Sequence, residues 1–160
     1  MKKIKVGFLP LYIKLYDDSQ GVGYRAPMEK YMNMAINMLE TQGIEIVQAD
    51  VCRIKPEFDA AAAMFNEADV DAVITFHLAY SPSLESIEAL LSLKAPIIVF
   101  DSTPDYELIK VAGYAGRISP NHGIHGVQDM CNLLVRNNKQ FFIVFRGLDI
   151  DLAYSLLQRE

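Results

Sequence analysis

Two kinds of hydrophobic pattern alternate along the chain. Short, nearly continuous apolar runs are typical of buried strands, and apolar residues recurring every three or four positions are typical of amphipathic helices. The strand-like runs occupy residues 3–11, 44–49, 71–76, 96–100 and 141–145. The helix-like segments cover residues 27–39, 58–68 and 84–93, the stretch after a turn at 119–129, and a last segment from Asp149 or Asp151 to Glu160.

Local signals support these helices. Gly43 ends the first helix, Pro56 suits the first turn of the second, and Ser83 has the chemistry of an N-cap for the third. The methionines of the first helix are expected to fill the core rather than form a ligand surface; they are Met28, Met32, Met34 and Met38. In the helix after the turn, the residues expected to face inward are Val127, Cys131, Leu134 and Val135.

Five apolar strands separated by amphipathic helices predict an α/β fold with a parallel sheet covered on both faces. The simplest right-handed arrangement is a flavodoxin-like, Rossmann-like three-layer sandwich with strand order 2-1-3-4-5. No linker or internal repeat divides the chain, so residues 1–160 are expected to form a single domain.

The composition argues against several classes of binding partner. The formal net charge is −5 with no basic stripe, which argues against nucleic-acid binding. The N-terminal apolar run is broken by Lys5 and Pro10, unlike a signal peptide, and no segment reaches the roughly 20 apolar residues that span a bilayer. Cys52 and Cys131 are too few and too far apart for a disulfide framework. We therefore expect a cytoplasmic protein that contacts neither nucleic acid nor membrane.

The turn at 119–129, Ser-Pro-Asn-His-Gly-Ile-His-Gly-Val-Gln-Asp, holds two of the three histidines. His122 and His125 are three residues apart at a helix start, so their side chains share one face and can reach one ligand together. The alternative is a polar helix start whose histidines are only solvated.

Other polar residues follow the predicted strands, at the edge where open α/β sheets bind ligands. Tyr12 follows the first strand, Tyr80 and Ser81 the third, and Asp101 the fourth. The common nucleotide-binding loops and the hydrolase nucleophile elbow are missing from the sequence.

Two chemistries remain open at this edge. A metal could be held by the three histidines together with Asp101. Charged imidazolium is disfavoured at a helix N-terminus. Neutral His122 and His125 can exchange hydrogen bonds with sugar hydroxyls, and Tyr12 or Tyr80 can offer an apolar face. This combination favours recognition of a polyol over catalysis.

Three segments, in order, resemble the L-fucose/L-arabinose isomerase superfamily. Asn121-His-x-x-His-Gly-x-x-Asp129 is similar to the Asn-Gln-x-x-His-Gly-x-x-Glu turn of L-arabinose isomerases. The segment 71–82, ending in Tyr80-Ser81-Pro82, resembles their third strand and its aromatic-Ser-Pro loop. Segment 6–12 resembles their first strand, which ends in Leu-Tyr.

The resemblance implies a metal-dependent aldose–ketose isomerase that uses Mn²⁺. It also implies that this N-terminal domain completes the active site of a neighbouring subunit in a trimer or hexamer. His125 matches the family histidine that reaches the neighbour's sugar, and Tyr12 matches the tyrosine near that sugar. His122 stands where arabinose isomerases have Gln, which leaves the choice of sugar open. Asn121, Tyr80 and Ser81 complete the set of expected substrate contacts.

The family's metal ligands and catalytic carboxylates lie downstream of such a domain. The 160-residue chain is therefore expected to bind no metal and to be inactive alone, as a recognition and oligomerisation domain that acts with its own C-terminal domain and neighbouring subunits. The alternative is a stand-alone flavodoxin-like module that binds a sugar or another small polar ligand.

Overall fold

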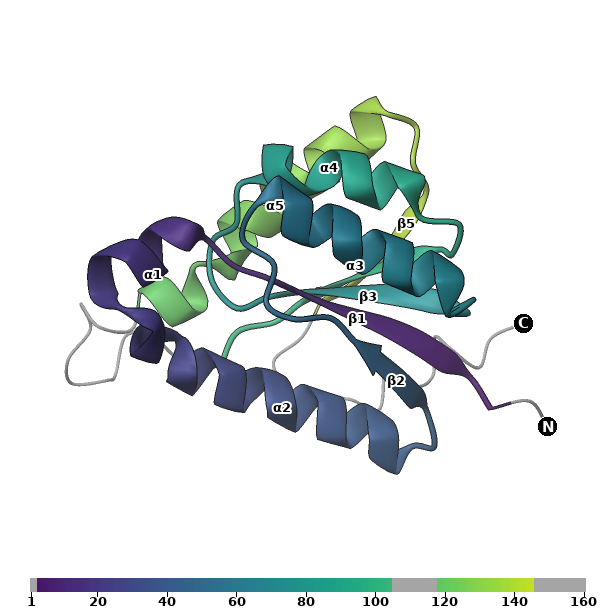
Figure 1. Ribbon diagram of the computed structural model, residues 1–160, viewed down its shortest axis with the longest axis horizontal. Helices are drawn as coiled ribbons and strands as arrows, with labels where there is room; N and C mark the ends of the chain where they lie inside the picture. The colour runs from purple at the N-terminus through teal and green to yellow at the C-terminus, as the bar shows by residue number, and fades with distance from the viewer. Residues whose placement is uncertain (1–2, 105–117, 146–160) are drawn as a thin grey trace.

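The apolar runs form a single parallel sheet in the computed structural model, which describes residues 3–104 and 118–145 (Figure 1). Neighbouring strands follow the order β2-β1-β3-β4-β5, which confirms the predicted fold class and strand order. The strands are β1 (Lys5–Leu11), β2 (Glu45–Gln48), β3 (Ala72–His77), β4 (Ile97–Asp101) and β5 (Phe141–Phe145).

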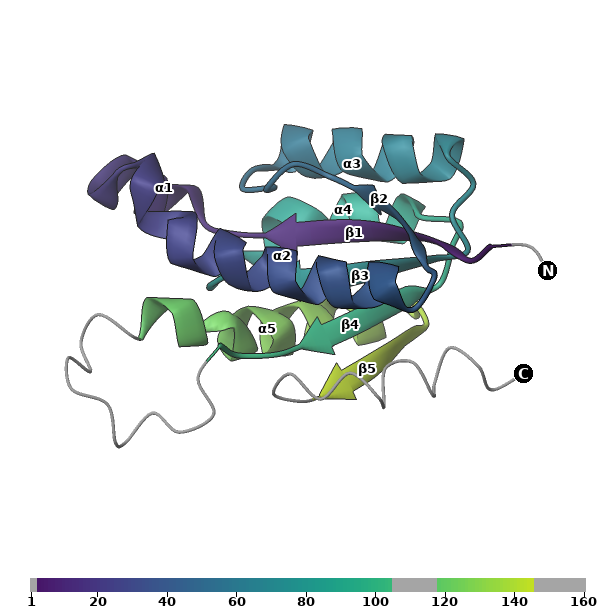
Figure 2. The same ribbon diagram turned by 90° about the horizontal axis from the view of Figure 1, so that it is seen from below.

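Helices cover both faces of this sheet. One face carries α2, and the other carries α3, α4 and α5 (Figures 1 and 2). The α-helices are α1 (Lys14–Gln20), α2 (Ala26–Thr41), α3 (Lys55–Glu67), α4 (Ser83–Ser92) and α5 (Gly123–Arg136). Two short 3₁₀ helices, η1 (Val22–Arg25) and η3 (Ser119–Asn121), precede α2 and α5.

Successive side chains of a strand point to opposite faces, so the sheet separates two hydrophobic cores. In β3, Ile74 and Phe76 pack with α2, whereas Val73 packs with the other three helices. The α2 side of the core includes Met28, Met32, Ala35 and Leu39. The stripes of α3, α4 and α5 include Phe58, Phe65, Leu90, Met130 and Leu134.

Two inward positions were predicted wrongly. Val135 is 63% exposed, because α5 buries Val127, Met130 and Leu134, and the next residue is turned about 100° away from that stripe. Met34 of α2 is 46% exposed, because the same geometry places it opposite Met32. Cys131 is half-buried, and both cysteines are free.

The predicted N-cap of α4 is also wrong. Pro82 occupies the N-cap position and Ser83 is the first helical residue. The Ser83 hydroxyl donates a hydrogen bond to the carboxylate of Asp129 in α5. A carboxylate is a strong acceptor for a hydroxyl donor, and this bond links α4 to α5.

Residues 14–25, for which the hydrophobic pattern predicts no element, form α1 and η1. Gly21 separates them with a φ of 82°. Of the seven residues of α1, only Asp17 is buried, so no apolar stripe signals this helix. Gly43, with a φ of 84°, does end the region of α2 as predicted.

The last predicted helix, from Asp149 or Asp151 to Glu160, lies outside the described residues. Within residues 3–104 and 118–145, none of the helices is long and apolar enough to cross a membrane.

Candidate functional site

The histidine turn begins at the edge where the parallel strands end. Residues 119–121 form η3, and α5 starts at Gly123 and packs against β3, β4 and α4. Figure 2 shows α1 and the start of α5 beyond the same edge of the sheet. The fold therefore places the turn where open α/β sheets bind ligands.

Three aromatic rings meet at this turn. The ring centroids of His122 and His125 lie 4.3 Å apart, and those of Tyr80 and His122 lie 5.9 Å apart. His125 is exposed, whereas His122 and Tyr80 are half-buried. We call Tyr80, His122 and His125 the ring cluster. The i,i+3 spacing does bring the two imidazoles side by side, and Tyr80 joins them from the β3–α4 loop.

The two glycines of the turn let α5 approach His77 closely. A Cβ atom on Gly126 would lie 2.7 Å from Cδ2 of His77 and 3.1 Å from the backbone nitrogen of Ser81. A Cβ atom on Gly123 would lie 3.1 Å from Cβ of His77. The glycines of the motif thus have a packing role, and they fix where the first turn of α5 sits.

His77, the third histidine, is 5% exposed beneath this helix turn. Neither ring nitrogen has a hydrogen-bond partner among the described residues. Burial lowers the pKa of His77 to about 3, so the imidazole stays neutral near neutral pH.

The described residues do not fit a metal ion. Among residues 3–104 and 118–145, no three His, Cys, Asp or Glu side chains are grouped so that they could hold one. His77 is packed against Gly126, and burial raises the pKa of the Asp101 carboxyl. We therefore assign no chemical step to Mn²⁺ on this part of the chain.

Tyr12 is not part of the ring cluster. It is fully buried on the α2 side of the sheet, and its ring centroid lies 5.8 Å from that of Tyr16. Its hydroxyl has no hydrogen-bond partner in the described part of the chain. Burial, together with the charge of Asp17, raises the pKa of Tyr12 to about 12.

Asn121 and Ser81 are buried beside the ring cluster. Asn121, in η3, is 8% exposed, and Ser81 is 1% exposed. The Ser81 hydroxyl finds no partner within the described ranges. Of the six residues expected from the sequence, three therefore form an accessible group, two lie buried next to it, and Tyr12 packs elsewhere.

A charged cluster at the same sheet edge was not anticipated. Oδ2 of Asp17 accepts hydrogen bonds from Nη1 of Arg25 at 2.8 Å and from Nη1 of Arg53 at 2.9 Å. Each arginine also pairs with a glutamate four residues later, Glu29 or Glu57. The i,i+4 pairs were visible in the sequence, but their meeting at Asp17 depends on the fold.

Comparison of the sequence with models of known protein families and with curated proteins finds no match.

Proposed function

We propose that the chain is the substrate-recognition domain of a metal-dependent aldose–ketose isomerase of the L-fucose/L-arabinose type. In this proposal the ring cluster binds the sugar, and the catalytic centre is supplied by a C-terminal domain and by neighbouring subunits. The observation that carries the proposal is the 4.3 Å approach of the His122 and His125 rings at the carboxyl edge of the sheet.

The chemistry of the ring cluster suits a sugar. A neutral imidazole has one donor and one acceptor nitrogen, and a sugar hydroxyl can donate and accept in turn. Two imidazoles three residues apart can therefore bind neighbouring hydroxyls of one sugar. The ring of Tyr80, 5.9 Å from that of His122, offers an apolar surface to the C–H face of the same ligand.

Accessibility supports the idea that the cluster acts on a ligand shared with another subunit. His125 is exposed at the sheet edge, and the exposed large hydrophobic residues include Leu84 of α4, which is 77% exposed. The role of His125 in this proposal is to hold and orient a sugar hydroxyl, without any proton or hydride transfer of its own.

Calorimetric titration of the purified chain with L-arabinose and with L-fucose tests the proposal. We expect saturable binding of at least one of these sugars. The His125→Ala variant should raise its Kd by about five- to tenfold, because a lost hydrogen bond costs about 1–1.5 kcal/mol. Asn132→Ala, at an exposed position two turns further along the same helix, is the matched control and should bind as the wild type does. Equal affinity of wild type and His125→Ala, or binding of neither sugar, would refute the proposal.

A further inference from the structure

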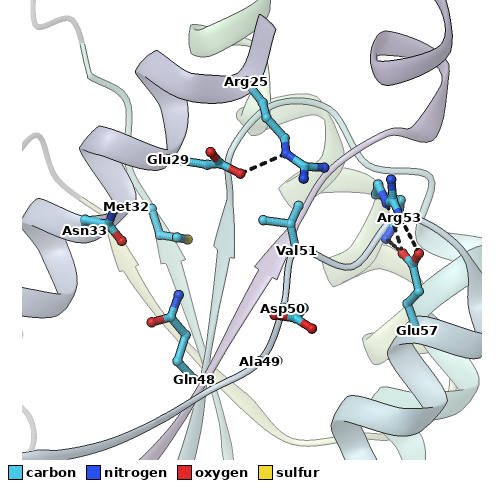
Figure 3. A pocket seen from close by; sticks show the side chains of 10 residues that line it. All are labelled: Arg25, Glu29, Met32, Asn33, Gln48, Ala49, Asp50, Val51, Arg53 and Glu57. Carbon is cyan, nitrogen blue, oxygen red and sulfur yellow. Dashed lines mark hydrogen bonds and ion pairs between the residues drawn. The ribbon is translucent and has the colours of Figure 1, made fainter. Parts of the chain in front are cut away.

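A pocket of about 520 Å³ opens on the other side of the sheet edge, between α2 and the segment that follows β2. Figure 3 shows Arg25, at the end of η1, and Glu29 of α2 across the hollow from Gln48 and Val51. The ring cluster belongs to α5 and the β3–α4 loop, so the two sites use different elements. A volume of this size falls in the range of small-ligand pockets.

The charges that line this pocket largely cancel. Arg25 donates from Nε to Glu29 at 2.8 Å and from Nη1 to Asp17 at 2.8 Å. Arg53 donates to both carboxylate oxygens of Glu57 and also to Asp17. An anionic ligand would have to compete with carboxylates already bound to the two arginines. A cationic ligand would face two guanidinium groups.

Hydrogen-bonding capacity remains after these pairings. The contacts of Arg25 with the described residues use Nε and one N–H of Nη1, which leaves three of its five N–H groups, one on Nη1 and two on Nη2. Asn33 and Gln48 line the pocket with exposed amide groups, and Asp50 adds an exposed carboxylate. A hydroxyl group can accept from a guanidinium and donate to a carboxylate at the same time, so it suits such paired charges better than an ion does.

The pocket also has an apolar part. Met32, 4% exposed, and Val51, half-buried, both line it. Figure 3 shows the Met32 and Val51 side chains among the polar groups. This combination of apolar surface and alternating donors and acceptors matches a carbon chain or ring that carries a hydroxyl on most carbons.

We infer that the pocket between α2 and the segment after β2 binds a neutral polyhydroxy compound of monosaccharide size, independently of the ring cluster. The structural basis has two parts. Arg25 and Arg53 already form ion pairs with Asp17, so their charges are neutralised. The polar side chains of Asn33, Gln48 and Asp50 line the same pocket.

An NMR titration of the full chain with xylitol, an uncharged pentitol, tests the inference. We expect saturable shifts of the backbone amide signals of Ala49 and Val51. The double variant Asn33→Ala/Gln48→Ala should raise the Kd read from these signals by about tenfold, since it removes two hydrogen-bonding amides. Both positions are exposed, so the fold should persist. Asn132→Ala, at an exposed position of α5, is the matched control and should leave the Kd unchanged.

Three results would overturn the inference. These are the absence of saturable shifts at Ala49 and Val51, an unchanged Kd in the double variant and in Asp50→Asn, and tighter binding of putrescine or inorganic phosphate than of xylitol. His125→Ala separates the two sites. If it abolishes all xylitol binding, the inference fails while the proposed function of the ring cluster stands. If the Ala49 and Val51 shifts persist in His125→Ala, the pocket binds independently.

Discussion

His77 is an ionisable side chain in a position that does not tolerate its charge. Its ring lies beneath the first turn of α5, 5% exposed, and neither nitrogen has a partner among the described residues. Because burial holds its pKa at about 3, the folded protein cannot protonate it at mildly acidic pH, whereas the unfolded chain protonates it near its ordinary value of 6.5.

This difference predicts a pH-dependent loss of stability. The pKa of His77 is lowered in the folded state, so between about pH 6.5 and pH 3 the unfolded state binds more protons. The histidine therefore lowers the free energy of unfolding by up to about 1.4 kcal/mol for each pH unit of acidification in that window. Urea unfolding across this range should show a shallower pH dependence for His77→Met, whose adaptable side chain can fill the site.

The exposed His125 gives the control for that experiment. His125→Ala also removes one histidine, but from an exposed site, and is the variant with which the pH dependence of His77→Met is compared. Equal slopes for wild type and His77→Met would show that His77 is not held neutral by burial.

At the scale of secondary-structure elements, the contact between α5 and β3 decides where the ring cluster lies. Gly126 allows α5 to rest on the His77 ring, and Ser83 of α4 fixes the same helix through Asp129. The position of His122 and His125 at the start of α5 thus depends on a close approach of backbone to a buried side chain.

The Gly126→Ala variant tests whether the close contact between Gly126 and His77 fixes the position of α5. Alanine is the better helix former by about 1 kcal/mol. Its Cβ atom would nevertheless lie 2.7 Å from His77 and 3.1 Å from the Ser81 nitrogen, so buried groups must move. Overpacking of this kind costs about 1–3 kcal/mol, so after the gain in helix propensity we expect a net loss of up to about 2 kcal/mol in the free energy of urea unfolding.

Gly23→Ala is the matched control, because apart from its chain neighbours no atom of the described residues lies within 4 Å of the position of its Cβ, and its φ is not positive. It should change stability by no more than about 0.5 kcal/mol. In a His77→Ala background the Gly126→Ala cost should shrink, since the contact has been removed. An undiminished cost there would mean that the His77 ring does not set the position of α5.

The same elements show what sequence patterns can and cannot predict. The strands and the helices α2 to α5 were predictable because each buries a continuous run or a stripe of apolar residues. The helix α1 was not, because only Asp17 of its seven residues is buried. The hydrophobic pattern also predicted that Val135 faces inward. Val135 follows the buried Leu134, and the sequence does not show which of two adjacent apolar residues contacts the sheet.

The candidate site was predictable to a similar extent. The spacing of His122 and His125 predicted that they share one face, and the structure adds that their rings lie 4.3 Å apart. The role of Ser83 as donor to Asp129 joins residues 46 positions apart, and the bond from Arg53 to Asp17 joins residues 36 positions apart. Such contacts depend on the order of the strands. The sequence predicted this order, but it did not predict which individual side chains meet.

At the scale of the whole molecule, the sheet has two candidate binding regions at its carboxyl edge. The ring cluster lies on the side of α4 and α5, and the pocket between α2 and the segment after β2 lies on the other side. The formal net charge of −5 and the pairing of Arg25 and Arg53 with carboxylates argue against an anionic ligand. Both proposals therefore concern uncharged polyhydroxy compounds.

The most direct test of the central claim follows the ring signals of the three histidines by NMR while L-arabinose is added. The His77→Met and His125→Ala variants assign the signals. If the ring cluster binds the sugar, the signals of His122 and His125 shift saturably, and the signal of the buried His77 stays in place. If the His122 and His125 signals remain unmoved, or if all three shift alike without saturation, the ring cluster does not recognise the sugar.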